Sequence, residues 1–422
     1  MDPVHNPFAP GAGQRPPELA GRDRELDAFD VLLERVSRGR PERSLVLTGL
    51  RGVGKTVMLG ELRSRALQRG WATGKVEARA GADLRRPLSA ALHRAVRDLA
   101  VRHRAPDRVE EALGVLKAFA LKANPEGTGM RDKWQPGIDV PATRGRADSG
   151  DIEIDLVELF SCIAELAADV GTGLVLLLDE MQDLGPQDVS ALCASCHELS
   201  QSGSPLVVVG AGLPHVPSVL AASKSYSERL FRYLRIDRLD PAAADRAVRA
   251  PIQREGADIN DDALAALYIT SGGYPYFVQA YGKAAWDAAP GHTITNADVA
   301  IAAPEAEAEL AVGFFGSRLE RATPAEREYL YAMAELASEE AGGDAVPTAL
   351  IAEHLRRKAS SLSPARDSLL KKGLVYATER GFVAFTVPHF GRFLTGHQPL
   401  SCQRARIELE YLKETIETAT MD

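Results

Sequence analysis

Two kinds of hydrophobic pattern alternate along the first 240 residues. Short apolar runs, which are typical of buried strands, occur at residues 44–49, 174–178 and 205–209. Stretches with helical spacing of apolar residues separate these runs, and they begin near Arg22 and cover residues 55–69, 87–101, 108–122 and 153–168. Strands that alternate with helices predict a parallel sheet with helices on both faces.

The second half of the chain follows a different pattern. Strand signals stop at Pro241 for the next segment, residues 241–289, which has the spacing of a small helical bundle. Residues 323–394 contain three helical segments and then two apolar strands, LVYAT and FVAFTV, on either side of a Glu-Arg-Gly turn. This order of helix, helix, helix and hairpin is typical of a winged helix.

A chain of 422 residues is expected to form two or three domains, at about 150 residues each. The first 21 residues contain five prolines, so we expect an extended segment that is either flexible or wrapped on a folded surface. The predicted parts are this N-terminal segment (1–21), an α/β core (22–240) with a Gly-, Pro- and Asp-rich insertion or hairpin at about 124–150, a helical lid (241–304), a winged-helix domain (305–397) and a charged C-terminal helix (398–422).

Composition excludes several classes of protein. Hydrophobic residues make up 45% of the chain and charged residues 26%, which are typical of globular proteins and exclude a chain that is disordered throughout. The formal net charge is -8, so any contact with DNA must be local. Four cysteines are too few for a disulfide scaffold, and no apolar run approaches the length of a membrane span, so we expect a cytoplasmic protein without membrane contact.

The strongest chemical signal follows the first apolar run. Residues 49–56 satisfy the phosphate-loop pattern GxxxxGK[ST], in which backbone N–H groups surround phosphate oxygens at the start of a helix. In that pattern Lys55 reaches the β- and γ-phosphates and Thr56 binds Mg²⁺. The predicted nucleotide-binding residues of the loop are Gly49, Leu50, Arg51, Gly52, Val53, Gly54, Lys55 and Thr56.

A second signal ends the apolar run at residues 174–178. Asp179 and Glu180 follow it directly, and ligands of parallel sheets bind at the carboxyl ends of the strands. This is a Walker B pattern, in which Asp179 holds Mg²⁺ through water and Glu180 orients and deprotonates the attacking water. The pattern predicts a site for ATP or ADP with Mg²⁺.

A Walker B strand with Glu after Asp resembles the additional-strand catalytic-glutamate (ASCE) P-loop NTPases. The chain resembles their AAA+ and STAND branches over nearly its whole length, and in particular bacterial origin-recognition-like (Orc/Cdc-type) ATPases with a C-terminal winged helix. The segment GRDREL, which begins at Gly21 and Arg22, is similar to a segment that lies against the adenine in those families. The resemblance therefore implies nucleotide contacts from Gly21 and Arg22.

The chain departs from that resemblance in the residues that sense the γ-phosphate. No Asn, Ser or Thr stands at the end of the 205–209 strand, where sensor 1 is expected. The resemblance places an arginine finger at Arg229, with Arg232 as a competitor and a surface ion pair as the alternative. A GxP pattern replaces the sensor 2 arginine, and it implies that Gly273 and Pro275 bring the lid close to the adenine. A histidine of the winged helix can touch the ADP β-phosphate in STAND proteins, but for His389 a structural role is favoured.

Two further patterns have competing interpretations. Residues 193–197 spell the haem-attachment pattern CxxCH, which we reject because they lie in a predicted helix of a cytosolic chain, and we expect a buried thiol pair. Residues 360–372 are predicted to form the recognition helix of the winged helix. This helix either binds DNA or presents a solvated basic face. The candidate DNA-binding residues are Arg356, Arg357, Lys358, Arg366, Lys371 and Lys372.

Together these patterns predict an ATP-binding AAA+ switch that hydrolyses ATP slowly and forms nucleotide-dependent homo-oligomers. Its winged helix is expected to bind duplex DNA in replication, mobile-element movement or regulation. The alternative is a STAND-like signalling or scaffold ATPase that assembles on ADP/ATP exchange without DNA. A third possibility, a subunit that binds nucleotide without turnover, is disfavoured because nucleotide storage alone requires no carboxylate such as Glu180.

Overall fold

The computed structural model describes residues 1–122, 137–337, 345–387 and 389–396. The described residues divide into two compact units, one within residues 1–303 and the other within residues 304–422. The C-terminal helix predicted at 398–422 lies outside the described residues, as does the first part of the predicted insertion.

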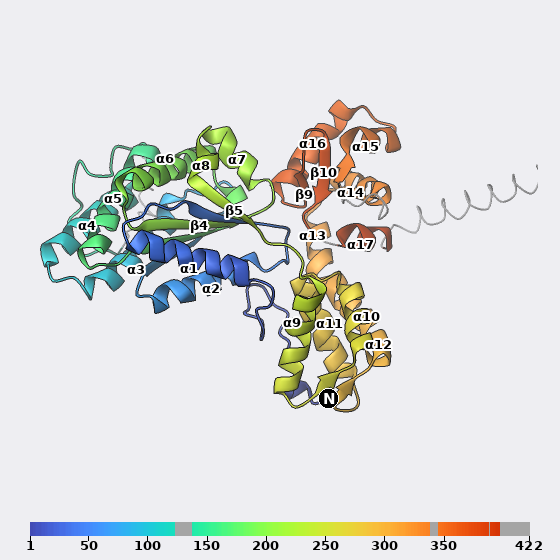
Figure 1. The fold of residues 1–422 in the computed structure, drawn as a ribbon. Coiled ribbons are helices and arrows are strands. Elements are labelled where there is room, and N and C mark those ends of the chain that lie inside the picture. Colours follow the sequence, from blue (N-terminus) through green and yellow to red (C-terminus); the bar gives the residue numbers. More distant parts are fainter. Residues whose placement is uncertain (123–136, 338–344, 388, 397–422) are drawn as a thin grey trace, which may run out of the picture. The chain divides into compact units, whose positions relative to one another are not determined.

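A five-stranded parallel sheet forms the centre of the first unit (Figure 1). Its strand order is β2-β3-β4-β1-β5, so β4 lies between the strand that precedes the glycine-rich loop and the strand that ends in Asp179. The predicted α/β P-loop fold is therefore confirmed. The strands are β1 (Ser44–Thr48), β2 (Ala72–Glu77), β3 (Leu174–Asp179), β4 (Leu206–Gly212) and β5 (Phe231–Arg235).

Helices bury both faces of this sheet, as the alternating patterns predicted. Val175 and Leu177 of β3 belong to the core under α1 and α2, whereas Leu174 and Leu176 belong to the core under the other helices. Successive residues of a strand point to opposite faces, so a strand buried on both sides is a continuous apolar run. The first pair of helices is α1 (Asp23–Ser37) and α2 (Lys55–Gln68), and the opposite group is α3 (Arg85–Ala100), α4 (Pro106–Leu121), α5 (Ile152–Asp169), α6 (Pro186–Ser202) and α7 (Val216–Ser223).

The pattern did not predict β2 and β5, which are the two edges of the sheet. An edge strand has only one neighbour and retains polar residues, so its sequence lacks a continuous apolar run. Gly74 and Lys75 interrupt β2, and Arg232 and Arg235 of β5 are exposed.

The described part of the predicted insertion, residues 137–150, contains no helix or strand. Lys117 of α4 donates hydrogen bonds to the carbonyl oxygens of Ile138 (2.8 Å) and Val140 (2.7 Å). Asp155 of α5 is fully buried and accepts hydrogen bonds from Ser149 (2.6 Å) and Arg85 (2.8 Å). These bonds fix the segment against the helices of the core.

Four helices follow the sheet in the region that the sequence predicts as a lid, and they are called the lid below. They are α9 (Pro241–Arg254), α10 (Asp261–Ser271), α11 (Pro275–Ala288) and α12 (Asn296–Glu309), of which the last continues beyond the first unit. A pairing of two-residue strands, β6 (Asp258–Ile259) with β7 (Thr293–Ile294), joins their ends and is too short to produce a sequence pattern.

The N-terminal segment wraps on the lid, which was one of the two predicted alternatives. It starts with a short 3₁₀ helix, η1 (Pro3–His5). Asn6 donates to the carbonyl oxygen of Lys283 on α11 (3.0 Å), and Phe8 is buried. The Phe8 ring lies 3.0 Å from the position of a Cβ on Gly282, so glycine lets the ring pack closely against α11.

The second unit has the predicted helices and hairpin with one further strand, β8, before its second long helix. The strands form an antiparallel sheet of order β8-β10-β9. Its elements are η3 (Leu310–Gly316), α13 (Ser317–Glu320), α14 (Pro324–Leu336), β8 (Ala345–Pro347), α15 (Thr348–His354), α16 (Ala359–Lys371), β9 (Val375–Ala377), β10 (Phe382–Phe385) and α17 (Phe390–Gly396).

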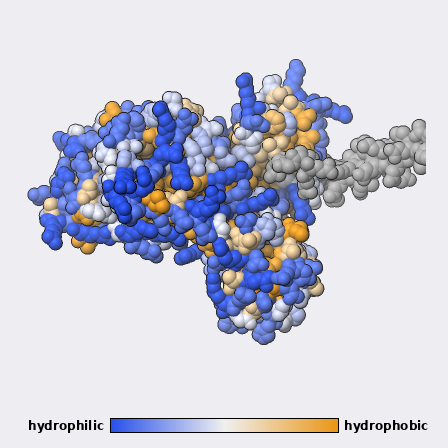
Figure 2. Space-filling model, in the orientation of Figure 1, coloured by the Kyte–Doolittle hydropathy of each residue, from blue (hydrophilic) through white to orange (hydrophobic). Residues whose placement is uncertain are grey.

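Hydrophilic residues predominate on the molecular face shown in Figure 2. Within the described residues, no helix combines the length and the apolar composition that crossing a membrane requires.

Candidate nucleotide-binding site

The glycine-rich loop connects β1 to α2, as predicted. A Cβ on Gly49 would lie 2.1 Å from the carbonyl oxygen of Ile236, so the chain can pass here only with glycine. Gly52 and Gly54 have φ angles of 83° and 92°, which favour glycine strongly. The loop therefore has the backbone freedom to turn its N–H groups inward at the start of α2.

Lys55 is buried at the first position of α2. Its ammonium donates hydrogen bonds to the carbonyl oxygens of Gly49 (2.9 Å) and Leu50 (2.7 Å). Burial lowers the pKa of Lys55 to about 8, against the opposing charge of Glu180. Among the described residues its hydrogen-bond acceptors are carbonyl oxygens of the loop, so the desolvated ammonium is suited to receive an anion.

The sheet brings Thr56 and Asp179 together, although they are distant in sequence. The Thr56 hydroxyl donates to Oδ2 of Asp179 over 2.8 Å. Asp179 is 5% exposed and ends β3, and Thr56 lies in the first turn of α2. Converging hydroxyl and carboxylate oxygens are the donors that Mg²⁺ prefers, so this pair fits the predicted metal.

Glu180 has a left-handed backbone, with φ 54°. Such a conformation in a residue other than glycine costs about 1–3 kcal/mol and is concentrated at functional sites. One carboxylate oxygen accepts from Arg51 of the loop (3.1 Å), and the other accepts from the side-chain amide of Gln182. Gln182 was absent from the sequence prediction, because nothing in its local pattern indicates this contact.

Gly21 and Arg22 contact the loop and the lid. Gly21 has φ 69°, and a Cβ there would lie 2.7 Å from Cβ of Ala243 on α9. The Arg22 guanidinium is buried and donates to the carbonyl oxygens of Val53 and Asp237. Burial lowers the pKa of Arg22. Arg22 thus fixes the back of the loop through main-chain contacts.

The start of α11 also reaches the loop. Gly273 has φ 72°, and a Cβ there would lie 2.6 Å from the carbonyl oxygen of Leu239. Pro275 is the first residue of α11, and the next residue, Tyr276, donates its backbone N–H to the carbonyl oxygen of Gly52 (3.2 Å). A hydrogen bond therefore joins the lid to the loop, and sequence reasoning had indicated Gly273 and Pro275 but not Tyr276.

The N-terminal segment passes beside the same site. A Cβ on Gly13, whose φ is 69°, would lie 3.2 Å from the Thr56 methyl carbon. Arg15 forms an ion pair of 3.0 Å with Glu61 of α2. Sequence reasoning missed this contact, which depends on the path of the segment through space.

Arg229 lies away from these residues. It belongs to the short helix α8 (Ser227–Leu230), directly before β5, and it is exposed with no ion pair to any described residue. The loop follows the carboxyl end of β1, and in a parallel sheet the amino ends of all strands lie on the opposite side of the sheet from it. Arg229 is thus unable to reach the loop of its own chain.

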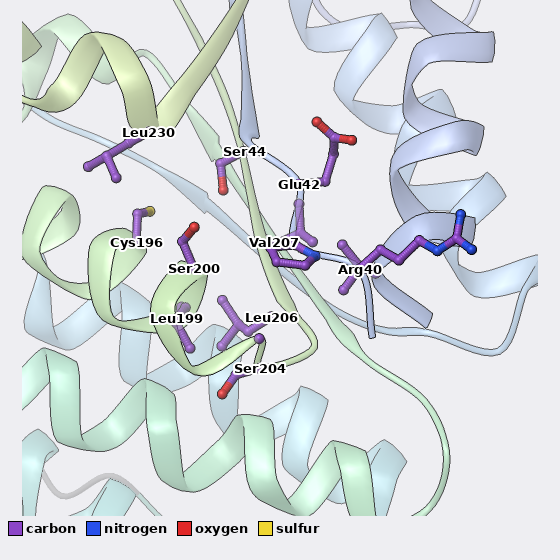
Figure 3. A pocket seen from close by; sticks show the side chains of 13 residues that line it. Arg40, Glu42, Ser44, Cys196, Leu199, Ser200, Ser204, Leu206, Val207 and Leu230 are labelled. Atoms are coloured by element: carbon purple, nitrogen blue, oxygen red, sulfur yellow. The ribbon is translucent and has the colours of Figure 1, made fainter. Parts of the chain in front are cut away.

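A small hollow also lies at the amino ends of the strands (Figure 3). Its volume is about 20 Å³, which is room for one water and not for a nucleotide. Ser44, Cys196 and Leu230 are among its lining residues (Figure 3).

The predicted thiol pair is buried, as expected. Cys193 and Cys196 lie on α6 with 0% and 6% exposure. Burial raises the pKa of Cys193 to about 11 and also raises that of Cys196. Both thiols therefore stay protonated and behave as apolar core groups.

The six candidate DNA-binding residues separate into two groups in the second unit. Lys372 donates to Glu326 (2.6 Å) and to the carbonyl oxygen of Arg321 (2.9 Å), so it serves the packing of α14. Arg357 and Arg366 form ion pairs with Glu328 (3.1 Å) and Asp367 (3.3 Å). Three exposed residues form no ion pair to a described residue: Arg356, Lys358 and Lys371.

Comparisons with protein families agree with this geometry. Residues 18–209 match the model of the AAA ATPase domain family, so this part of the chain is an AAA ATPase domain, as its motifs indicated. Residues 312–394 match a domain of unknown function (DUF8462). No curated protein matches the chain.

Three solved structures are similar to the chain at low sequence identity. A Walker-type ATPase of Pyrococcus abyssi is 16% identical with a TM-score of 0.56, over 90% of this chain and 97% of that one. Orc1 of Aeropyrum pernix in complex with DNA has 16% identity and a TM-score of 0.42, over 90% and 93% of the two chains. The RuvB Holliday junction branch migration motor of Thermotoga maritima has 16% identity and a TM-score of 0.42, over 92% and 100%.

Proposed function

We propose that the chain binds ATP with Mg²⁺ at the 49–56 loop and hydrolyses it slowly, as a nucleotide-dependent switch. The observation that carries this proposal is the convergence of Lys55, Thr56, Asp179 and Glu180 at the carboxyl ends of β1 and β3. The AAA ATPase domain match over residues 18–209 supports it.

Each of these residues has a role that follows from its place. Lys55 and the loop N–H groups bind the β- and γ-phosphates, and Thr56 and Asp179 hold the metal. Bound Mg²⁺ supplies neutralisation of phosphate charge. Glu180 takes the proton from the water whose oxygen bonds to the γ-phosphorus, as the bond from that phosphorus to the β-phosphate oxygen breaks.

Two features support slow turnover. Glu180 is paired with Arg51 over 3.1 Å, and this ion pair must open before the carboxylate can serve as a base. The end of β4 also lacks a polar side chain of its own. The hydrogen bond from Tyr276 to Gly52 would allow the lid to respond to a change in the loop, which is the behaviour of a switch.

Two variants test this proposal. Lys55→Ala should abolish ATP binding in titration calorimetry, because backbone amides alone leave much of the phosphate charge unneutralised. Glu180→Gln should retain ATP affinity and lose phosphate release, since an amide is no base. Undiminished ATP binding by Lys55→Ala would refute the assignment of the loop, and undiminished turnover by Glu180→Gln would remove that carboxylate from the reaction.

We further propose that the second unit is a winged helix that binds duplex DNA through the start and end of α16. The order α14, β8, α15, α16, β9, β10 supports the winged helix. Arg356, Lys358 and Lys371 lie at the two ends of α16, are exposed and form no ion pair with any described residue, so their charge is available to phosphates. A signalling ATPase without DNA binding is the alternative, and it requires no free cations at these positions.

A triple charge reversal tests the DNA proposal. Changing Arg356, Lys358 and Lys371 to Glu should weaken duplex binding and reduce the salt slope of log K by about one unit per lost phosphate contact. A matched control makes the same change in charge on exposed residues of the first unit: Arg24, Arg40 and Arg43. Equal, salt-insensitive signals from the parent and the triple variant would favour the signalling alternative.

A further inference from the structure

Strand β4 carries glycine at two alternate positions of its carboxyl end, Gly210 and Gly212. A Cβ on Gly210 would lie 1.9 Å from the sulfur of Met181, and a Cβ on Gly212 would lie 2.8 Å from Oε1 of Gln182. Alternate residues of a strand share one face. The 3₁₀ turn η2 (Met181–Asp183), which follows the Walker B strand, therefore lies across β4 where the strand has no side chains.

The amide of Gln182 occupies the place at the end of β4 where a polar side chain was expected. Its Oε1 accepts the backbone N–H of Leu213 (3.0 Å), and its Nε2 donates to the Glu180 carboxylate. A backbone N–H only donates and a carboxylate only accepts, so both partners demand the same orientation of the amide. Gln182 thus links the end of β4 to Glu180.

We propose that Gln182 is a positioning residue for ATP hydrolysis, which supplies from η2 the polar group that β4 lacks. This inference rests on the proposed function. The amide holds one oxygen of Glu180 and leaves the other, now paired with Arg51, to take the proton from water. Because Oε1 is bound to the main chain after β4, a shift of that strand end would move Glu180.

The decisive variant is Gln182→Glu. Glutamate keeps an oxygen for the N–H of Leu213 and replaces the donor to Glu180 with a second carboxylate oxygen. We expect kcat for ATP hydrolysis to fall about 10- to 100-fold, the scale on which misplaced catalytic groups lose rate, while KM and ADP affinity change less than about twofold. The matched control is Gln201→Glu, which makes the same substitution on an exposed residue of α6.

A purely structural role gives a different result. If Gln182 serves only to accept the N–H of Leu213, Gln182→Glu should have the same kcat as the parent. Gln182→Met, which loses that acceptor, should then have a lower kcat than the parent. That outcome would overturn the inference.

Gly212→Ala perturbs the same amide without changing it. The added methyl would lie 2.8 Å from Oε1 of Gln182 and 2.6 Å from Cγ2 of Val216, so the amide must move. We expect a loss of kcat in the same direction with ADP affinity retained. If Gln182→Glu fails to fold, this variant decides, and an unchanged kcat overturns the inference.

A double-mutant cycle tests whether Gln182 acts through Glu180. In the Glu180→Gln background, adding Gln182→Glu should leave the residual rate unchanged, because the base it positions is already absent. Additive losses would overturn the inference. A parent that releases no Lys55-dependent phosphate would overturn the proposed function and this inference with it, whereas an active parent with an equally active Gln182→Glu variant would overturn this inference alone.

Discussion

The contact between Glu326 and Lys372 gives a prediction of stability against pH. Glu326 is 3% exposed at the start of α14. Burial by itself raises the pKa of Glu326, but hydrogen bonds from Lys372 and Ser368 and from the backbone N–H of Thr323 lower it from 4.5 to about 2. The carboxylate is therefore stabilised in its charged form by the folded second unit.

This difference in pKa can be expressed as a free energy. About two and a half pKa units correspond to about 3 kcal/mol of stability for the second unit. Because the folded pKa lies below the unfolded one, this contribution is complete above pH 4.5 and decreases as the pH falls toward 2. At pH 3 about 2 kcal/mol should already be lost.

Glu326→Gln removes the titrating group. We expect amide hydrogen exchange of α14 in the full chain to be about 100-fold faster in this variant than in the parent at pH 7, and about tenfold faster at pH 3. Comparison at equal pH removes the intrinsic pH dependence of exchange. Glu328→Gln is the matched control on the same helix, because Glu328 is 42% exposed and its pair with Arg357 should contribute little. A ratio that stays constant from pH 7 to pH 3 would refute the reasoning.

Three further predictions concern the nucleotide site. Arg229→Ala should lower the rate of ATP hydrolysis at least about tenfold at protein concentrations that permit assembly, since Arg229 lies at the amino ends of the strands, opposite to its own loop. An equal loss in a monomeric sample, checked by gel filtration, would contradict a role between subunits. Arg51→Met should raise kcat in a phosphate-release assay by up to about fivefold, because an ion pair between half-buried side chains restrains the Glu180 carboxylate by about 1 kcal/mol at most. A lower kcat would instead show that Arg51 assists the reaction. Gly13→Val should weaken Mg²⁺–ATP binding in titration calorimetry, because the valine side chain would press on Thr56. Gly39→Val is the control and should leave binding unchanged, because Gly39 is also a left-handed glycine but has nothing within 4 Å of its Cβ position. Equal effects of the two substitutions would remove the N-terminal segment from the site.

The amount of the fold that the sequence predicted depended on burial. Residues 174–178 and 205–209 form β3 and β4, which have neighbours on both sides and helices on both faces, so their sequences are continuous apolar runs. The edge strands β2 and β5 carry polar residues and gave no such run. Pairing partners decide the identity of an edge strand, and they lie elsewhere in the chain.

The candidate site shows the same division. The sequence by itself determined the loop from Gly49 to Thr56, because its glycine turns and helix start are contacts between neighbouring residues. Only the tertiary structure placed the amide of Gln182 at the end of β4 and paired Lys372 with Glu326, because these contacts join segments far apart in the chain. A local pattern reports the conformation and burial of its own residues. The partner of a polar side chain is set by how the packed elements meet in space.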